Sequence, residues 1–295
     1  MGISLSLARD YWALAKPRVV ALIVFTAAIG AALAMLKKPA DPLSVCLALL
    51  GIALTAASAA AFNCLVESYA DAAMTRTKSR PLPAGRLKTW EAASFSALLG
   101  GMGMWLSAKF GGALCAWLTA ATFFGYAVIY TLYLKRATPQ NIVIGGASGA
   151  MPPVLGWTAV SGDLTFEPLL LFLIIFVWTP PHFWALALYR SEDYARAGLP
   201  MLPVTHGKKF TAAQIVLYAA LLFAVSLLPF VSGMSGVVYL SAAVFLGARF
   251  IRLSWRARQT LADADGRKLF TYSITYLSLL FAAIFIDAFI IAWEN

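Results

Sequence analysis

An all-α protein that crosses a membrane many times is the fold class that the sequence predicts. Of its 295 residues, 61% are hydrophobic and only 12% are charged, whereas a soluble domain carries about a quarter charged residues. Apolar runs long enough to cross a hydrocarbon core of about 30 Å recur along the whole chain. We expect about nine transmembrane helices, near 19–36, 43–64, 91–108, 113–133, 141–160, 168–189, 211–231, 235–252 and 270–291.

These runs are expected to form a single transmembrane domain over residues 1–295, because no soluble domain fits between them. The narrowest separations are 109–112 and 232–235. Residues 1–18 have neither the apolar core of a signal peptide nor the composition of a transit segment. We therefore expect mature sequence from the start, which favours the inner (plasma) membrane of a bacterium.

The positive charges predict the orientation. With the N-terminus in the cytoplasm, only Lys37, Lys38 and Lys109 of the 23 lysines and arginines fall outside, and the C-terminus lies outside. Positive residues gather on the cytoplasmic side of membrane proteins, so the net charge of +10 gives no reason to expect nucleic acid. Because the inner loops after the second and sixth runs are long and polar, we expect one bundle around a cavity open to the cytoplasmic face.

Cysteine and histidine usage excludes two classes of protein. Three cysteines in or beside apolar runs cannot make a paired disulfide framework. With only His182 and His206, the chain is also unsuited to a membrane cytochrome that holds haems between pairs of histidines.

The second run ends in a row of oxygen-bearing side chains, Asn63, Glu67 and Asp71. Steps of four residues keep all three side chains on one face of an α-helix. Three cations follow closely: Arg76, Lys78 and Arg80. Carboxylates and amides suit a hard cation, and the nearby positive charges suit a phosphorylated ligand. The alternative is a solvated helix end of mixed charge.

The sixth run contains Pro180, Pro181 and His182. Prolines in a spanning helix remove backbone donors and kink it, which is tolerated where the helix lines a cavity. A histidine at membrane depth indicates function. The alternative is a neutral imidazole bonded to a freed backbone carbonyl. Glu192 and Asp193 follow about three turns later, at the expected inner mouth.

Two further signals lie between these constellations. Lys135 and Arg136 close the fourth run, where they either bind an anion or serve topology alone. The segment 145–149 of the fifth run is rich in glycine, which permits either close helix packing or room for a bulky ligand.

Taken in this order, the motifs resemble the intramembrane prenyltransferases of the UbiA superfamily over nearly the whole chain. The quoted segments are Lys16-Pro17-Arg18, Asn63 with Glu67 and Asp71, Arg76-Thr77-Lys78-Ser79-Arg80-Pro81-Leu82, Leu134-Lys135-Arg136, Gly149 to Trp157, Pro181-His182-Phe183-Trp184, Asp193-Tyr194, Pro200 to Val204 and Arg267-Lys268-Leu269-Phe270. Two positions depart from the common pattern: Glu67 stands where aspartate is usual, and His182 where many relatives have an acid. The second departure matches the haem-modifying branch.

The resemblance implies transfer of a farnesyl group from farnesyl diphosphate to a vinyl group of haem b, with addition of water to give haem O. It further implies Mg²⁺ held by Asn63, Glu67 and Asp71, with Lys135 and Arg136 also catalytic. The expected diphosphate-binding residues are Arg76, Lys78, Arg80 and Asp193. Two roles compete for His182, axial ligation of the haem iron and a hydrogen bond near the diphosphate, and contact with the haem is the one we favour. A haem A-forming enzyme or a terminal oxidase could receive the product.

Two other functions stay open at this stage. One is prenyl transfer to an aromatic quinone precursor. The other is transport, because intramembrane acids and broken helices also mark ion pathways. The acids gather at one membrane face rather than at the midplane, which argues against a transporter.

Overall fold

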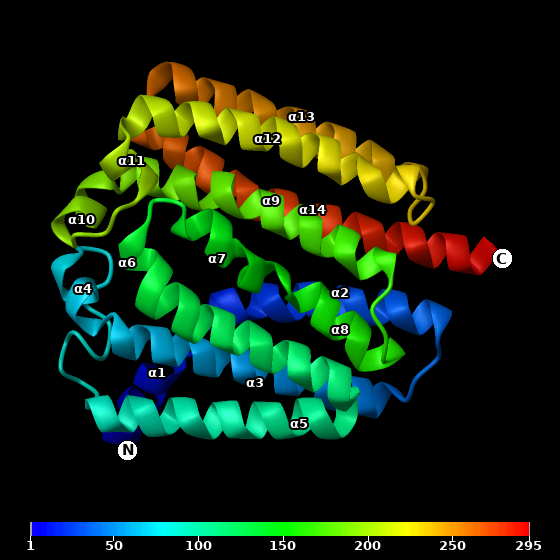
Figure 1. Cartoon of the computed structure of the whole chain (residues 1–295), viewed down its shortest axis with the longest axis horizontal. Helices are drawn as coiled ribbons and strands as arrows, with labels where there is room; N and C mark the ends of the chain where they lie inside the picture. The colour runs from blue at the N-terminus through cyan, green and yellow to red at the C-terminus, as the bar shows by residue number, and fades with distance from the viewer. Residues whose placement is uncertain (1, 295) are drawn as a thin grey trace.

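The protein is a bundle of long helices, with short helices gathered at one end (Figure 1). The computed structural model describes residues 2–294, and within that range it contains no β-strand. The elements are α1 Gly2–Leu14, α2 Pro17–Lys37, α3 Pro42–Val66, α4 Ser68–Ala73, α5 Thr89–Phe124, the π-helix η1 Gly125–Leu134, α6 Lys135–Ala137, α7 Asn141–Ala150, α8 Pro152–Ser161, α9 Phe166–Tyr189, α10 Ser191–Arg196, α11 Leu202–Thr205, α12 Gly207–Val231, α13 Val237–Thr260 and α14 Asp263–Glu294.

The predicted all-helical membrane fold is confirmed. Within the described range, seven helices are long and apolar enough to cross a membrane: α2, α3, the continuous stretch Thr89–Ala137, α9, α12, α13 and α14. Two features account for the difference between these seven helices and the nine that the sequence predicts. The count of nine stays a prediction.

The first feature is a sharp bend at Gly112, inside the stretch Thr89–Ala137. Gly112 has φ +81° and ψ 175°, a conformation open to glycine but strained for other residues. The two arms of this stretch run antiparallel, so that α5 and η1 lie side by side on α3 (Figure 1). The arms correspond to the predicted runs 91–108 and 113–133.

The second feature is the division of the predicted run 141–160 into α7 and α8, each of 10 residues. Pro152 begins α8, and a proline lacks the N–H that would continue the hydrogen bonding of the preceding helix. Gly156 allows α8 to pack closely against α2, because a Cβ at this position would lie 1.8 Å from the Ala27 carbonyl oxygen. In α7, a Cβ at Gly145 would strike the Tyr130 ring at 2.2 Å, so this glycine serves close packing.

Helix α9 is the most buried of the candidate spans and contacts α7, α8, α12 and α14. It continues through Pro180 and Pro181 as one helix from Phe166 to Tyr189. The sequence predicted a kink there, yet the two prolines do not divide the element. The short helices α4, α10 and α11 lie at the end of the bundle where α3 and α9 finish (Figure 1). The two predicted polar constellations are therefore at the same end.

Candidate active site

The three oxygen-bearing side chains at the end of α3 keep helical spacing. The helix is interrupted at Glu67, whose φ of −93° and ψ of 4° separate α3 from α4. Two backbone bonds still join residues four apart: the Glu67 N–H donates to the Asn63 carbonyl at 3.0 Å, and the Asp71 N–H to the Glu67 carbonyl at 2.8 Å. Asn63, Glu67 and Asp71 are 3%, 6% and 1% exposed. They are a buried row of oxygen ligands.

Each member of this row is paired with a cation from a different segment. Lys16 Nζ donates to Asn63 Oδ1 at 2.6 Å, and Arg80 Nη1 to Asp71 Oδ2 at 2.6 Å. Lys135, at the end of η1, forms an ion pair with Glu67. Buried carboxylates need such partners, because an unpaired buried charge costs several kcal/mol. The row therefore lies among positive charges.

Lys16 is a site residue that the sequence reasoning missed. It has φ +48°, one of two non-glycine residues with positive φ in the described range, and this left-handed conformation is costly for a lysine. A following proline also disfavours the right-handed α conformation at Lys16. The conformation at the start of α2 directs the ammonium group toward Asn63. The Lys16-Pro17 dipeptide was the available signal, but it does not reveal the partner.

A π-helix supplies the opposite side of this site. In η1, Thr131 Oγ1 donates to the Tyr126 carbonyl at 2.8 Å and accepts from Asn63 Nδ2 at 3.3 Å. Segments of π-helix occur frequently at functional sites. Here η1 places Thr131 against the row from α3, and Lys135, the first residue of α6, follows η1 directly.

The loop between α4 and α5 contributes cations unequally. Burial alone would lower the pKa of the Arg80 guanidinium, but the nearby Asp71, Cys64 and Glu67 raise that pKa overall. Arg80 thus remains charged between the two carboxylates. Arg76 and Lys78 are both exposed, and the charge of Arg76 lies near Tyr194. The exposed Arg136, beside Lys135, makes no recorded contact with the carboxylates in the described part of the chain.

Asp193 ties the two polar loops together. It pairs with Arg196 and, at 3.5 Å, with Arg190. Arg196 Nη2 also donates to Thr75 Oγ1 at 3.2 Å. Figure 1 shows the result as the adjacent positions of α4 and α10. The structure thus joins segments that the sequence separates by more than a hundred residues, while Glu192 stays exposed.

His182 lies in a neutral setting between α9 and α14. Its ring is stacked between Trp178, at a centroid distance of 4.2 Å, and Phe270, at 4.7 Å. Its Nδ1 is 2.6 Å from Ser273 Oγ. The partner is a hydroxyl group rather than the freed backbone carbonyl considered above, and no contact in the described chain joins His182 to the carboxylates.

The hydrogen bonds of Ser273 select one tautomer of this imidazole. Ser273 Oγ donates to the Phe270 carbonyl at 2.6 Å, so its oxygen accepts the Nδ1 proton of His182. The proton on Nδ1 leaves Nε2 with a lone pair, and Nε2 has no hydrogen-bond partner among residues 2–294. A histidine that binds a metal usually donates its other N–H in this manner.

The donor set at the end of α3 fits Mg²⁺ in part. No group of three histidine, cysteine, aspartate or glutamate side chains could hold a metal ion within the described range. Asn63, Glu67 and Asp71 supply one amide and two carboxylate groups, all buried. Mg²⁺ is commonly bound by one or two carboxylates together with substrate phosphates. The row therefore suits a metal ion that arrives with a diphosphate.

Fold and site together define a polytopic membrane protein with paired acids and bases at one end of its helical bundle. The model of the UbiA prenyltransferase family matches residues 23–285, and the chain belongs to this family. The chain is 59% identical to a protoheme IX farnesyltransferase of Azoarcus sp., covering 96% of this chain and 95% of that protein. It is 57% identical to one of Thiobacillus denitrificans, covering 95% and 93%.

Solved structures confirm the fold. The Aeropyrum pernix UbiA homolog, in its apo form, matches with a TM-score of 0.73 and 18% identity, over 91% of this chain and 98% of that one. An Archaeoglobus fulgidus UbiA homolog bound to GPP and Mg²⁺ matches with a TM-score of 0.62 and 16% identity, over 93% and 99%.

Proposed function

We propose that this protein transfers the farnesyl group of farnesyl diphosphate to a vinyl group of haem b, with addition of water to give haem O. The relatives named protoheme IX farnesyltransferase support the substrates, because they are 57–59% identical to this chain over nearly its full length. The observation that carries the proposal is the pairing of two unlike sites in one bundle. One is a charged row at the end of α3, and the other is a neutral histidine in α9.

In this proposal Asn63, Glu67 and Asp71 would hold Mg²⁺ together with the diphosphate. The Mg²⁺ found with GPP in the Archaeoglobus fulgidus homolog supports a divalent ion in the family. A bound Mg²⁺ ion neutralises charge on the diphosphate and so makes it a better leaving group.

The cations assist departure of the diphosphate. Lys135 and Arg80 lie against the two carboxylates, within reach of an anion bound there, and stabilise the charge that develops on it. Arg76 extends this positive region toward α10, where Asp193 holds Arg190 and Arg196 in place. Lys78 and Arg136, which are exposed, add positive charge at the edge of this region.

Breaking the C1–O bond of farnesyl diphosphate leaves an allylic cation. The terminal carbon of the haem vinyl group attacks C1, and the positive charge moves to the carbon next to the porphyrin ring. Water adds to that carbon and loses a proton, which gives the hydroxyethylfarnesyl group. We assign the haem to the α9 side, where the free lone pair on His182 Nε2 suits an iron ligand better than a Mg²⁺ ligand.

We further propose that one domain spans residues 1–295 and lies in a bacterial inner membrane, with the N-terminus in the cytoplasm. The distribution of lysine and arginine supports this orientation. Farnesyl chains and haem are both lipophilic, which suits catalysis within the bilayer. Haem O would then pass to a haem A-forming enzyme or a terminal oxidase.

Product analysis tests the reaction. Purified protein is incubated with haem b, farnesyl diphosphate and Mg²⁺, and the extracted pigment is resolved by chromatography and mass spectrometry. We expect a farnesyl-plus-water adduct that disappears when Mg²⁺ is chelated. Unmodified haem, with diphosphate released in the presence of a hydroxybenzoate acceptor, would indicate a quinone-precursor enzyme instead. Diphosphate binding without turnover on any acceptor would indicate transport.

A further inference from the structure

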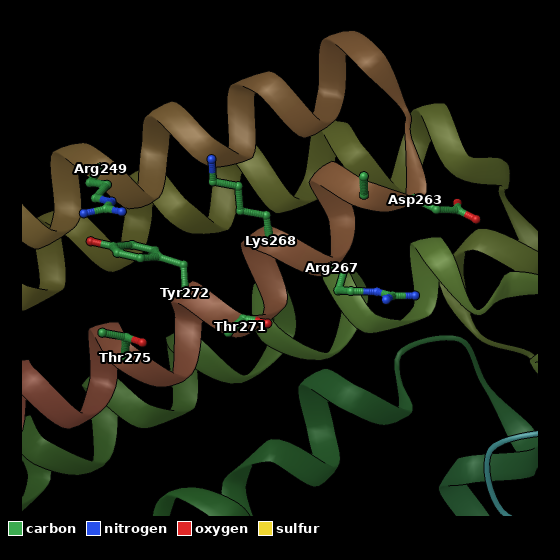
Figure 2. A pocket seen from close by; sticks show the side chains of 8 residues that line it. Arg249, Asp263, Arg267, Lys268, Thr271, Tyr272 and Thr275 are labelled. Carbon is green, nitrogen blue, oxygen red and sulfur yellow. The ribbon is translucent and has the colours of Figure 1, made fainter.

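A groove of about 740 Å³ lies between α13 and α14, apart from the candidate active site. Figure 2 shows Arg249 and Tyr272 near one end of it, Lys268 in the middle, and Arg267 and Asp263 toward the other end. The groove is polar where these side chains meet. None of these residues is used in the proposed reaction.

The groove carries uncompensated positive charge. Arg249, Arg267 and Lys268 are exposed, and none of them forms an ion pair with a carboxylate in the described part of the chain. Arg249 instead lies over the Tyr272 ring at 4.9 Å. The one acid of the groove, Asp263, is already paired with Lys208 at 3.3 Å. This arrangement therefore favours the binding of an anion.

Beyond the groove, each of its two helices exposes a large apolar side chain. On α14, Thr271, Thr275 and Leu279 follow one another at four-residue spacing and are all exposed, so they lie on one helix face. On α13, the exposed Phe245 lies one turn before Arg249. A ligand with a phosphate at one end and hydrocarbon at the other matches this sequence of surfaces.

The depth of the groove also fits such a ligand. Trp293, near the far end of α14, is 84% exposed, and exposed tryptophans favour the membrane interface. Tyr272 precedes it by 21 residues, which is about 32 Å along a helix. This distance equals the thickness of the hydrocarbon core, about 30 Å. Tyr272 and its neighbouring cations are therefore placed at headgroup level of the opposite interface.

We propose that this groove binds the phosphate headgroup of an anionic phospholipid. Arg249 and Lys268 contact the phosphate from the two helices, Thr271 offers a hydroxyl donor, and an acyl chain follows Phe245 and Leu279. Basic pockets between membrane helices on the cytoplasmic side bind such headgroups. A free diphosphate shares the phosphate chemistry but has no hydrocarbon chain to contact Phe245 and Leu279.

The test compares lipid retention by native mass spectrometry. The full-length protein in detergent is mixed with equal amounts of phosphatidylglycerol and phosphatidylcholine that have identical acyl chains. We expect preferential retention of phosphatidylglycerol by the native protein. In R249Q/K268Q the preference should fall about 30-fold, because each basic residue near a membrane surface contributes about 1 kcal/mol.

Two further variants separate this site from general charge and from misfolding. R252Q/R258Q removes the same charge from α13 outside the groove and should keep the preference. R249K/K268R preserves the charge and should also keep it, while thermal unfolding reports the integrity of each variant. Equal preference in R249Q/K268Q and the native protein would overturn the proposal. Retention of inorganic diphosphate at this groove, with no preference for phosphatidylglycerol, would overturn the lipid assignment.

Discussion

The two polar regions of the bundle satisfy their buried polar groups with different kinds of partner. At the end of α3, Asn63, Glu67 and Asp71 each meet a cation. In α9, His182 meets aromatic rings and one hydroxyl group. The first region can exchange one charged partner for another, whereas the second stays neutral and keeps a lone pair free. We infer that the first region serves a polyanion and the second a flat, lipophilic acceptor, and this division can be tested by substitution.

The largest effect is expected at Asp71. Asp71→Asn removes the carboxylate that pairs with Arg80 and supplies metal-binding oxygen, so farnesyl transfer should fall by about 10²- to 10³-fold. Haem binding should be unchanged, because His182 has no contact with this row. Product formation and the haem absorption spectrum measure the two effects separately.

The matched control for this substitution is Asp41→Asn. Asp41 caps the other end of α3, accepting from the Ser44 N–H at 2.9 Å, and the asparagine can retain a cap. Activity should therefore stay near that of the native protein. If Asp71→Asn weakened haem binding as much as transfer, the division between the two regions would be wrong.

The second effect concerns His182. His182→Ala should abolish the spectral change on haem binding and reduce product formation by about 10- to 100-fold, while binding of farnesyl diphosphate is retained. His206→Ala is the control, because His206 is exposed and bonds the neighbouring Thr205. An unchanged haem spectrum and unchanged product yield in His182→Ala would remove His182 from the haem site.

A smaller effect is expected at Ser273, which positions His182 without touching substrate. Ser273→Ala removes the acceptor for Nδ1, so either tautomer becomes available; the KM for haem should rise about tenfold, the lower end of second-sphere effects on metal sites. Ser273→Thr keeps the hydroxyl and should restore the native spectrum.

A buried serine elsewhere controls for simple loss of packing. Ser254 of α13 donates to the Phe250 carbonyl at 2.9 Å, and Ser254→Ala should leave the haem spectrum unchanged. The tautomer argument fails if Ser273→Ala and Ser254→Ala behave alike.

Hydrophobicity in the sequence was sufficient to predict most of the helices. The run 168–189 corresponds to α9, Phe166–Tyr189, and the bend at Gly112 lies within the predicted separation 109–112. Such runs can be predicted because burial of apolar side chains in the bilayer is a property of the segment itself. The N-terminal helix α1 was not predicted, because its segment is too short to span and carries mixed charge.

The site could be predicted in composition but not in pairing. Helical spacing was sufficient to relate Asn63 to Glu67 and Asp71, because that relation is local. The contact of Lys16 with Asn63 and that of Ser273 with His182 join residues 47 and 91 positions apart. Such pairs depend on how whole helices pack, and no spacing rule reports them. The assignment of catalytic roles to these residues stays a prediction.

The smallest expected effect is the pH dependence of the contacts between the two polar loops. Burial would raise the pKa of the Asp193 carboxyl, but the Arg196 hydrogen bond and charge, with Thr75 and Arg190, lower it overall. A lowered pKa means that the contribution to stability is complete above the ordinary aspartate pKa of about 3.9 and is lost as the pH falls through the folded-state value. Asp193→Asn should therefore destabilise the protein by about 1 kcal/mol, equally at neutral pH and at about pH 5. Thermal unfolding measures the difference, with Glu192→Gln as the control for loss of an exposed negative charge beside it. The difference should shrink only in more acidic buffer; a difference that vanished between about pH 5 and 8 would mean that another group controls this contact.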